Sequence, residues 1–295
     1  LVTKALLKKA GPRTLTDQFY YPEMGSGQIY QTIAEKISRK NHLLLENEPV
    51  RIVSKDNLIT EVNLRDGKSH FPKTVVSSIP ITTLIGLMDP APSSEIMDAV
   101  NGLRFRSQVY LFVTIDKPSV SKNQWIYFPD AEIPFGRISE MVNFSSRMAP
   151  EGKTSLFIEF FCWKDDNIWN ASKDDLFELS IPWLEKLELI TRDEVMDAYH
   201  FKRDHVYPVY DLAYKGHLDV IKHYLNHISN LIYIGRPGRF LYTNQDHSLE
   251  MGILAARSII DNKRYNIEDI GVEQAYFERG FVKTRQPVQN PDGHN

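Results

Sequence analysis

The stretch from residue 235 to residue 246 holds the side chains whose types and spacing are best suited to chemistry. Two arginines, Arg236 and Arg239, stand among residues that break regular structure, namely Gly235, Pro237 and Gly238. Glycine lets a backbone approach a ligand closely, and guanidinium groups bind anions through charged hydrogen bonds. A polar run, Asn244-Gln245-Asp246, then opens a predicted helix, whose first turn offers N–H groups and the positive end of a dipole. The pattern indicates a site for an anionic group.

A short strand and a helix are predicted to position this turn. Leu231 to Ile234 has the length and composition of a buried strand. Asn244 or Thr243 can cap the helix, and Thr243-x-x-Asp246 fits a capping box. Helical spacing predicts one apolar face, with small residues that allow close packing, made of Leu249, Gly252, Ile253, Ala256, Ile259 and Ile260. An ordinary, well-capped strand–helix unit accounts for the same spacing.

A second candidate stretch is rich in tyrosine. Tyr207, Tyr210 and Tyr214 can present hydroxyl groups and flat ring faces. Such side chains suit a sugar, a diphosphate or an aromatic ring. The alternative is an aromatic strand end that packs on the core.

Other kinds of catalytic site find little support in the sequence. His223 and His227 stand one helical turn apart, but neither a glutamate after the first histidine nor a thiolate completes a zinc site, so no metal is expected. No G-x-S-x-G nucleophile elbow is present. The single cysteine, Cys162, lies in an apolar run, so it is predicted to be buried and inert.

Composition is that of a globular protein without a special surface charge. The 295 residues carry a formal net charge of −3, which indicates no general affinity for nucleic acid or anionic membranes. No apolar run approaches the 18 or so residues that a transmembrane helix needs. One cysteine excludes an internal disulfide and fits a reducing compartment, so a cytoplasmic location is expected.

The rest of the chain reads as sheets and helices of mixed type. A helix is predicted near residues 28–40, with Ile29, Ile33 and Ile37 on one face, and strands with tight turns follow up to Pro80. Pro90-Ala91-Pro92 is a natural hinge. Alternating strands suited to an antiparallel sheet are expected at 106–116, 124–128, 137–144, 155–163 and 196–207. Helices are expected at 1–10, 94–102, 174–190, with a break or kink at Pro182, and 215–229.

One long pattern resembles a known family. G-R-x-G-x-F-x-Y-x-N-x-D-x-S-x-x-x-G-x-x-A-A, over residues 235–256, resembles the C-terminal flavin motif of a large FAD-dependent superfamily. That superfamily contains amine oxidases, protoporphyrinogen oxidase, phytoene desaturases and UDP-galactopyranose mutase. The Gly-Arg start, Tyr242 and the polar run before the helix are most similar to the mutase-like branch. Shorter matches cover residues 19–27, 75–80 and 203–215.

The resemblance implies FAD as cofactor, with NAD(P)H as a candidate reductant. It implies that cofactor binding falls to Val50, Gly235, Arg236, Asn244, Gln245, Asp246 and Ser248, and substrate binding to Tyr207, Tyr210, Arg236 and Tyr242. In flavoproteins the cofactor carries the chemistry, so no catalytic residue is assigned. Further substrate-binding arginines have Arg104, Arg106 and Arg137 as candidates.

The resemblance also implies a fold. We expect an α/β protein with a partial Rossmann-like FAD-binding domain, formed by residues 1–90 and 203–275, and a mainly antiparallel α+β substrate-binding domain at 91–202. Residues 276–295 would form a tail. Superfamily members begin with a strand–G-x-G-x-x-G–helix unit, which this sequence lacks. The expectation is therefore a C-terminal part of a longer flavoprotein, with weakened FAD affinity and with homo-oligomerisation left open.

Three functions stay open at this point. The first is an FAD-dependent oxidoreductase or flavin-dependent mutase that acts on a nucleotide-sugar-like small molecule. The second is an amine oxidase-, protoporphyrinogen oxidase- or desaturase-like oxidoreductase with an apolar substrate. The third is a non-catalytic relative that uses the pocket for binding alone.

Overall fold

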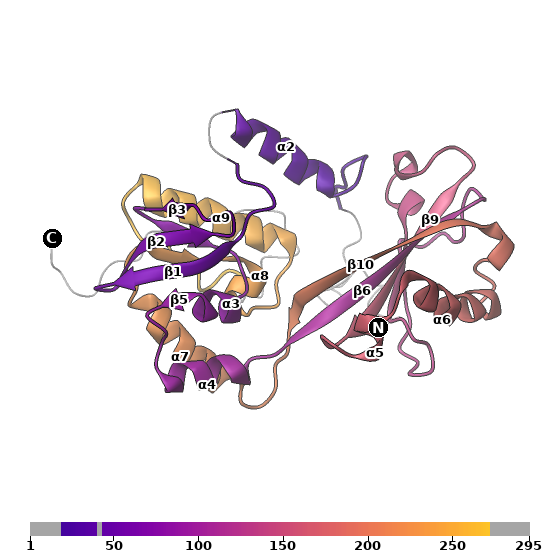
Figure 1. The fold of residues 1–295 in the computed structure, drawn as a ribbon. Coiled ribbons are helices and arrows are strands. Elements are labelled where there is room, and N and C mark those ends of the chain that lie inside the picture. Colours follow the sequence, from indigo (N-terminus) through magenta and orange to yellow (C-terminus); the bar gives the residue numbers. More distant parts are fainter. Residues whose placement is uncertain (1–18, 40–42, 272–295) are drawn as a thin grey trace, which may run out of the picture. The chain divides into compact units, whose positions relative to one another are not determined.

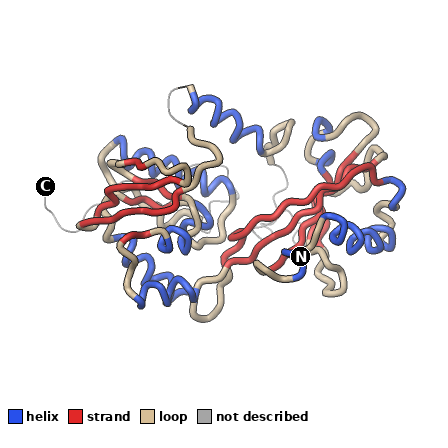
Figure 2. Tube along the Cα trace, viewed as in Figure 1, coloured by secondary structure: helices blue, strands red, loops and turns tan. Residues whose placement is uncertain are grey.

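The computed structural model describes residues 19–39 and 43–271, which fall into two compact units (Figures 1 and 2). Of the described residues, unit 1 contains 19, 46–104 and 207–271, and unit 2 contains 20–39, 43–45 and 105–206. Both units mix helices with sheets, so the predicted α/β class is confirmed. The helix expected at 1–10 and the tail at 276–295 lie outside the described residues.

The unit boundaries differ from the expected domain ranges at two places. The chain passes between units at residues 104–105 and 206–207, whereas the expected substrate-binding domain spanned residues 91–202. Residues 20–45 also belong to unit 2. Tyr21 stacks on Phe144 with ring centroids 4.9 Å apart, and Glu23 forms an ion pair of 2.6 Å with Arg147. These contacts attach the segment to unit 2.

Unit 1 contains a four-stranded sheet in the order β3-β2-β1-β5. Its strands are β1 (Pro49–Lys55), β2 (Leu58–Leu64), β3 (Ser69–His70) and β5 (Met88–Asp89). The first three strands are antiparallel, and β5 runs parallel to β1. Asp56 and Asn57 both have positive φ angles, 52° and 60°, as the tight turn between β1 and β2 requires.

A second sheet of unit 1 consists of two parallel strands, β4 (Val75–Ser77) and β11 (Leu231–Tyr233). Five helices accompany the sheets: α3 (Ile81–Gly86), α4 (Ser94–Gly102), α7 (Tyr214–Asn226), α8 (Gly235–Arg239) and α9 (Gln245–Ile260). α4 and α7 lie side by side (Figure 1). Because β4 and β11 are parallel, their carboxyl ends meet at one edge.

Unit 2 is built on a five-stranded antiparallel sheet in the order β10-β6-β9-β8-β7. The strands are β6 (Phe105–Ile115), β7 (Trp125–Tyr127), β8 (Arg137–Glu140), β9 (Thr154–Cys162) and β10 (Val195–Pro208). Alternate residues of β6 and β9, such as Val109, Leu111 and Ile158, are fully buried in the core. This period of two confirms the predicted half-buried strands.

Helices pack on this core or lie at its margins. α6 (Lys173–Lys186) contributes Leu176, Ile181 and Leu184 to the core, and Pro182 lies inside the helix. The other helical elements of unit 2 are α2 (Gly27–Ser38), η1 (Met141–Asn143), η2 (Ser146–Met148), α5 (Asn167–Asn170) and η3 (Arg192–Glu194). α2 has no buried residue, and its apolar face of Ile29, Ile33 and Ile37 is exposed.

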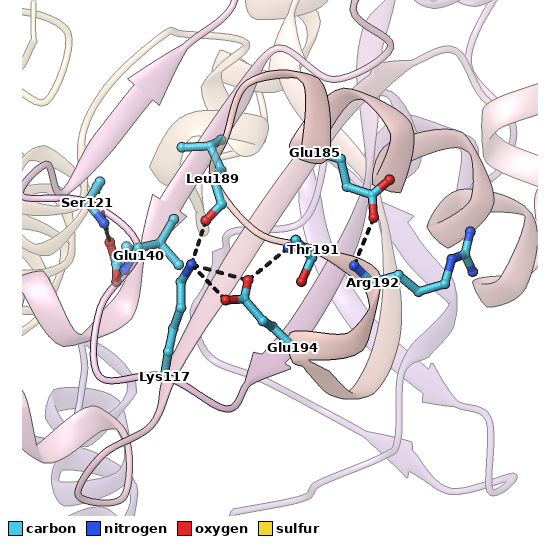
Figure 3. A network of polar contacts seen from close by, with 9 residues as sticks. Lys117, Ser121, Glu140, Glu185, Leu189, Thr191, Arg192 and Glu194 are labelled. Carbon is cyan, nitrogen blue, oxygen red and sulfur yellow. Dashed lines mark hydrogen bonds and ion pairs between the residues drawn. The ribbon is translucent and has the colours of Figure 1, made fainter.

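Polar contacts tie the connections of unit 2 to its sheet (Figure 3). Lys117 donates to the carbonyl oxygen of Leu189 over 3.0 Å and forms an ion pair of 3.2 Å with Glu194. The buried carboxylate of Glu140 accepts the backbone N–H groups of Val120 and Ser121 over 2.6 and 2.7 Å. These charged groups therefore have structural partners.

Two local predictions for the stretch after β11 were wrong. Residues 235–239 form the short helix α8 instead of an irregular turn. Pro237 is tolerated there because it lies in the first turn, where a backbone N–H would have no acceptor within the helix. α9 buries the opposite face from the predicted one: Leu249, Ile253, Ile259 and Ile260 are exposed. The buried residues are His247, Glu250, Met251, Leu254, Ala255 and Ser258. Met251, Leu254 and Ala255 form a core with residues 267 and 270, which lie far along the chain.

Candidate functional site

The parallel strands β4 and β11 place two turns beside each other. The backbone N–H of Ile234 donates to the carbonyl oxygen of Ser77 over 2.8 Å, so both strands end at the same level. Gly235 follows with φ of +79°. This left-handed conformation is strained for any residue that has a Cβ. A Cβ on Gly238 would lie 3.3 Å from the carbonyl oxygen of Ile79. Both glycines are therefore needed for the close approach of α8 to the end of β4.

Arg236, the second residue of α8, is held against two aromatic rings. Its guanidinium carbon lies 5.0 Å from the ring centroid of Tyr207 and 5.0 Å from that of Tyr242. The two rings stack with centroids 5.5 Å apart. The guanidinium also donates through Nε to the carbonyl oxygen of Thr243 over 2.7 Å. Cation–π contacts and a carbonyl acceptor orient the group and leave its positive charge in place.

Tyr210 connects this cluster to the segment before α9. Its hydroxyl oxygen accepts the backbone N–H of Tyr242 over 2.6 Å. The ring stacks on Tyr214 with centroids 4.5 Å apart and meets the edge of Phe240 at 6.1 Å. Burial raises the pKa of Tyr210, which keeps the phenol protonated. Tyr210 thus fixes the backbone that carries Tyr242 toward the start of α9.

The first turn of α9 presents backbone donors. Within the described part of the chain, the N–H groups of Gln245 and Asp246 have no hydrogen-bond acceptor. Asn244 is the N-cap, so the predicted Thr243–Asp246 capping box is wrong. The third helical residue is instead His247, whose Nδ1 accepts the Asn244 N–H over 3.0 Å. The positive end of this 16-residue helix therefore lies beside the cluster that Arg236 forms with Tyr207 and Tyr242.

His247 is fully buried in this turn. Burial lowers its pKa, in part against the carboxylates of Asp246 and Glu250, so the ring is neutral. Because Nδ1 accepts a hydrogen bond, the single ring proton of the neutral imidazole is on Nε2. Met251, one turn further and also buried, accepts the Gly235 N–H on its sulfur over 3.2 Å. Both side chains link the helix to the turn.

The structure therefore brings most of the predicted site residues together. Tyr207, Tyr210, Arg236 and Tyr242 form one cluster, and Asn244, Gln245, Asp246 and Ser248 lie at the start of α9. Val50 stands apart in β1 of the four-stranded sheet, with its side chain 47% exposed. Their roles in binding remain predictions.

Sequence reasoning missed Thr243, His247, Met251 and Phe240 as supports of this cluster. His247 could have been found, since a histidine at the third helical position can return a bond to the N-cap. The carbonyl of Thr243 could not, because its role depends on the conformation of the backbone.

The candidate substrate arginines have other partners. Arg104 pairs with Asp211 at 3.5 Å, and Arg106 lies over the Trp163 ring at 4.5 Å. Arg137 donates two bonds of 2.7 Å to the buried carboxylate of Glu159. Each of these arginines therefore has a structural contact in the described chain.

The remaining chemical candidates have local partners as well. His227 Nδ1 lies 2.6 Å from the carbonyl oxygen of His223, and the described residues contain no group of three or more side chains that could hold a metal ion. Cys162 is buried, as predicted, and burial raises the pKa of its thiol to about 11. None of the helices in the described part of the chain is long and apolar enough to cross a membrane.

Comparison with known proteins gives a family and a fold. The model of the family described as flavin containing amine oxidoreductase matches residues 6–260. A solved structure of reduced UDP-galactopyranose mutase has a TM-score of 0.73 at 20% identity, over 85% of this chain and 55% of that one. A putative protoporphyrinogen oxidase from Exiguobacterium sp. has a TM-score of 0.61 at 16% identity, over 76% of this chain and 48% of that one. The chain spans about half the length of these two proteins, and at such identities the likeness shows the fold alone.

Proposed function

The chain belongs to the flavin containing amine oxidoreductase family, and on this basis we propose that it supplies the flavin-edge site of an FAD-dependent enzyme that acts on a nucleotide-sugar-like substrate. Family membership makes it a flavin-dependent, oxidoreductase-type protein, and the finer assignment is a mutase-like reaction. One observation carries the assignment. A positively charged, tyrosine-flanked arginine stands beside the free first turn of α9 at the end of two parallel strands.

The residues at this edge fit an isoalloxazine group. When bound, FAD would supply two-electron redox chemistry or a nucleophilic centre. The N–H groups of Gln245 and Asp246 at the start of α9 would face the ring edge on which negative charge develops. Gly235 has no Cβ, so the turn after β11 can approach a flat ring closely. Asn244 and Ser248 complete the proposed cofactor set at the helix start, and Val50 would contact the adenine end.

The substrate would lie against the arginine–tyrosine cluster. Arg236 provides a charge suited to a diphosphate, and Tyr207, Tyr210 and Tyr242 provide rings and hydroxyl groups for a sugar or a base. Tyr242 is 57% exposed, so its hydroxyl can reach a ligand. The described residues offer no feature that supports NAD(P)H as the reductant.

A second candidate function is oxidation of an apolar substrate by the same flavin. Aromatic side chains on one face of the unit 2 sheet favour an apolar ligand, without regard to how this unit lies relative to unit 1. Tyr110 stacks on Phe157 with centroids 5.0 Å apart, and Phe112 lies 6.2 Å from Phe157 and 6.5 Å from Tyr199. The charge of Arg137 on this face is neutralised by Glu159. Such a face suits a flat, uncharged molecule better than a diphosphate.

The test begins with absorbance of the purified protein during titration with FAD, in this chain and in the longest form of the protein that can be expressed. Appearance of the bound-flavin bands supports a flavoprotein. No binding in either form would overturn the flavoenzyme proposal and favour a non-catalytic relative.

UDP-galactose titration then separates the two substrate classes. Arg236→Met should weaken binding about 10- to 100-fold, since it removes a charged hydrogen-bond donor. Arg65→Met, which removes an exposed arginine paired with Glu48, should leave the affinity unchanged. Equal affinities in wild type and Arg236→Met would remove the nucleotide-sugar assignment and leave the apolar one.

A further inference from the structure

Unit 1 contains a cavity of about 750 Å³ that is separate from the arginine–tyrosine cluster. Three segments line it: the end of β1 with the following turn at residues 54–57, the segment at residues 90–96 around the start of α4, and residues 219–228 at the C-terminal end of α7. None of the proposed flavin or substrate residues lines it. Its volume falls in the range of small-molecule sites.

The walls of this cavity are held by packing between secondary-structure elements. α4 packs along α7, and Gly102 touches the ring of His217 so closely that a Cβ would collide with it at 2.5 Å. Tyr224 on α7 and Ser54 near the end of β1 both line the cavity. Apolar surface comes from buried Ile228 together with Pro92 and Val220. The cavity is thus a feature of several packed elements.

The charge around this cavity is negative. Asp56, Glu95 and Asp219 line it, and within the described residues none of the three takes part in an ion pair. One ammonium group, that of Lys55, also lines the cavity. Three carboxylates against one ammonium leave two net negative charges when the imidazoles are neutral. Carboxylates that surround an apolar wall and lack a partner favour a cationic occupant.

The histidines add further acceptor character. His227 Nδ1 lies 2.6 Å from the carbonyl oxygen of His223. A carbonyl oxygen can only accept, so Nδ1 carries the proton and Nε2 of the neutral ring is an acceptor. The rings of His223 and His227 meet edge to face with centroids 4.5 Å apart, and both line the cavity. The lining therefore offers aromatic surface and acceptors together.

We propose that this cavity is a binding site for a small organic cation with N–H donors on a planar, apolar body, such as an aryl amidinium or guanidinium. The carboxylates of Glu95 and Asp219 pair with the cation, which donates hydrogen bonds to them. The imidazoles and Tyr224 contact the planar body, and Pro92, Val220 and Ile228 exclude water from it. The site is independent of the flavin proposal, because it shares no residue with it.

Calorimetric titration with three compounds of one shape tests the charge preference. Benzamidine is cationic, benzamide is neutral and benzoate is anionic, and all three carry the same ring. Benzamidine should bind about tenfold or more tightly than benzamide, and benzoate should bind least. Raising the salt concentration should weaken benzamidine binding. Equal affinities for benzamidine and benzamide, or no binding of benzamidine, would overturn the proposal.

Variants then locate the binding. Asp219→Asn and Glu95→Gln should each weaken benzamidine binding about two- to fivefold, as expected for one exposed charge. The matched control is Asp98→Asn, which removes an exposed carboxylate one turn after Glu95 on α4, outside the cavity lining. It should change nothing. Unchanged affinity in the Glu95→Gln, Asp219→Asn double variant, or an equal loss in the control, would place the binding elsewhere and refute the site.

Discussion

Two arginines, one in each unit, meet tyrosine rings in similar ways but donate to different kinds of acceptor. Arg137 in unit 2 lies 5.6 Å from the Tyr127 ring centroid and donates through Nε and Nη2 to the carboxylate of Glu159, over 2.7 Å each. Arg236 in unit 1 lies 5.0 Å from two tyrosine rings and donates to a backbone carbonyl. The acceptor of Arg137 is a carboxylate, and an acceptor of Arg236 is a carbonyl oxygen.

The difference separates a structural arginine from a candidate binding arginine. Glu159 is buried and also accepts from Gln108 over 3.0 Å, so the Arg137 pair is part of a closed polar network inside the sheet. Arg236 lies in the short helix α8 and donates to the carbonyl oxygen of Thr243, directly before the start of α9. Residue type and aromatic neighbours are alike in both places. The two arginines differ in the group that accepts their hydrogen bonds, which is a carboxylate for Arg137 and a backbone carbonyl for Arg236.

The largest expected effect is on the stability of unit 2. Arg137→Met leaves the buried carboxylate of Glu159 without its cation, and this should lower the free energy of unfolding by about 3–5 kcal/mol. Urea denaturation measures the loss. Arg192→Met, which breaks an ion pair between two exposed side chains in the same unit, should lower it by about 1 kcal/mol or less. Similar losses in the two variants would contradict a structural role specific to Arg137.

Arg236→Met provides the opposite test. It removes two hydrogen bonds to the carbonyl oxygen of Thr243 and two ring contacts, so the loss of stability should be smaller, about 1–2 kcal/mol. FAD and UDP-galactose affinity, in contrast, should respond to Arg236→Met and not to Arg137→Met in folded protein. A stability loss for Arg236→Met as large as that of Arg137→Met would remove the distinction between the two arginines.

Tyr210 sharpens the comparison on the unit 1 side. Tyr210→Phe keeps the ring stack and removes the oxygen that accepts the Tyr242 N–H. Stability should fall by about 1 kcal/mol, and ligand affinity should fall with it, because the segment before α9 loses its anchor. Tyr214→Phe, which retains the stack and that hydrogen bond, is the matched control. Equal behaviour of the two variants would show that the Tyr210 hydroxyl has no positioning role.

The smallest effect concerns pH. Burial lowers the pKa of His247 in the folded protein, whereas the unfolded chain binds a proton near pH 6.5. The stability contribution of the neutral ring is therefore complete above about pH 6.5 and is lost as the pH falls from there toward the lowered pKa. Urea midpoints between pH 5 and pH 8 should fall more steeply for wild type than for His247→Gln. Parallel curves would contradict a buried neutral histidine at the start of α9.

Much of the fold follows from local sequence patterns. The strands of the unit 2 sheet were predicted to within a few residues from their alternation, because a period of two reports directly which residues face a core. The order of those strands and the pairing of β11 with β4 did not follow from any local pattern. They depend on contacts between residues far apart in the chain.

The α9 helix shows where local patterns fail. Its apolar spacing predicted a buried face of Leu249, Ile253 and Ile260, and these side chains are exposed in the described structure. Met251 and Leu254 are buried instead, since β11 and residues after the helix pack on the other side. Periodicity identifies an apolar face, but the neighbouring elements decide which face is covered.

The sequence by itself determined the α/β class, the short strand that begins at Leu231, the helix capped by Asn244 and the resemblance to a flavin family. These features are local, because backbone conformation and helix start depend on residues only a few positions apart. Tertiary structure alone decided that Tyr207, Tyr210 and Tyr242 meet Arg236, that His247 is buried neutral, and that the acceptor of Arg137 is Glu159. Charge at a site depends on which acceptor folding brings to each guanidinium, and no local spacing specifies that partner.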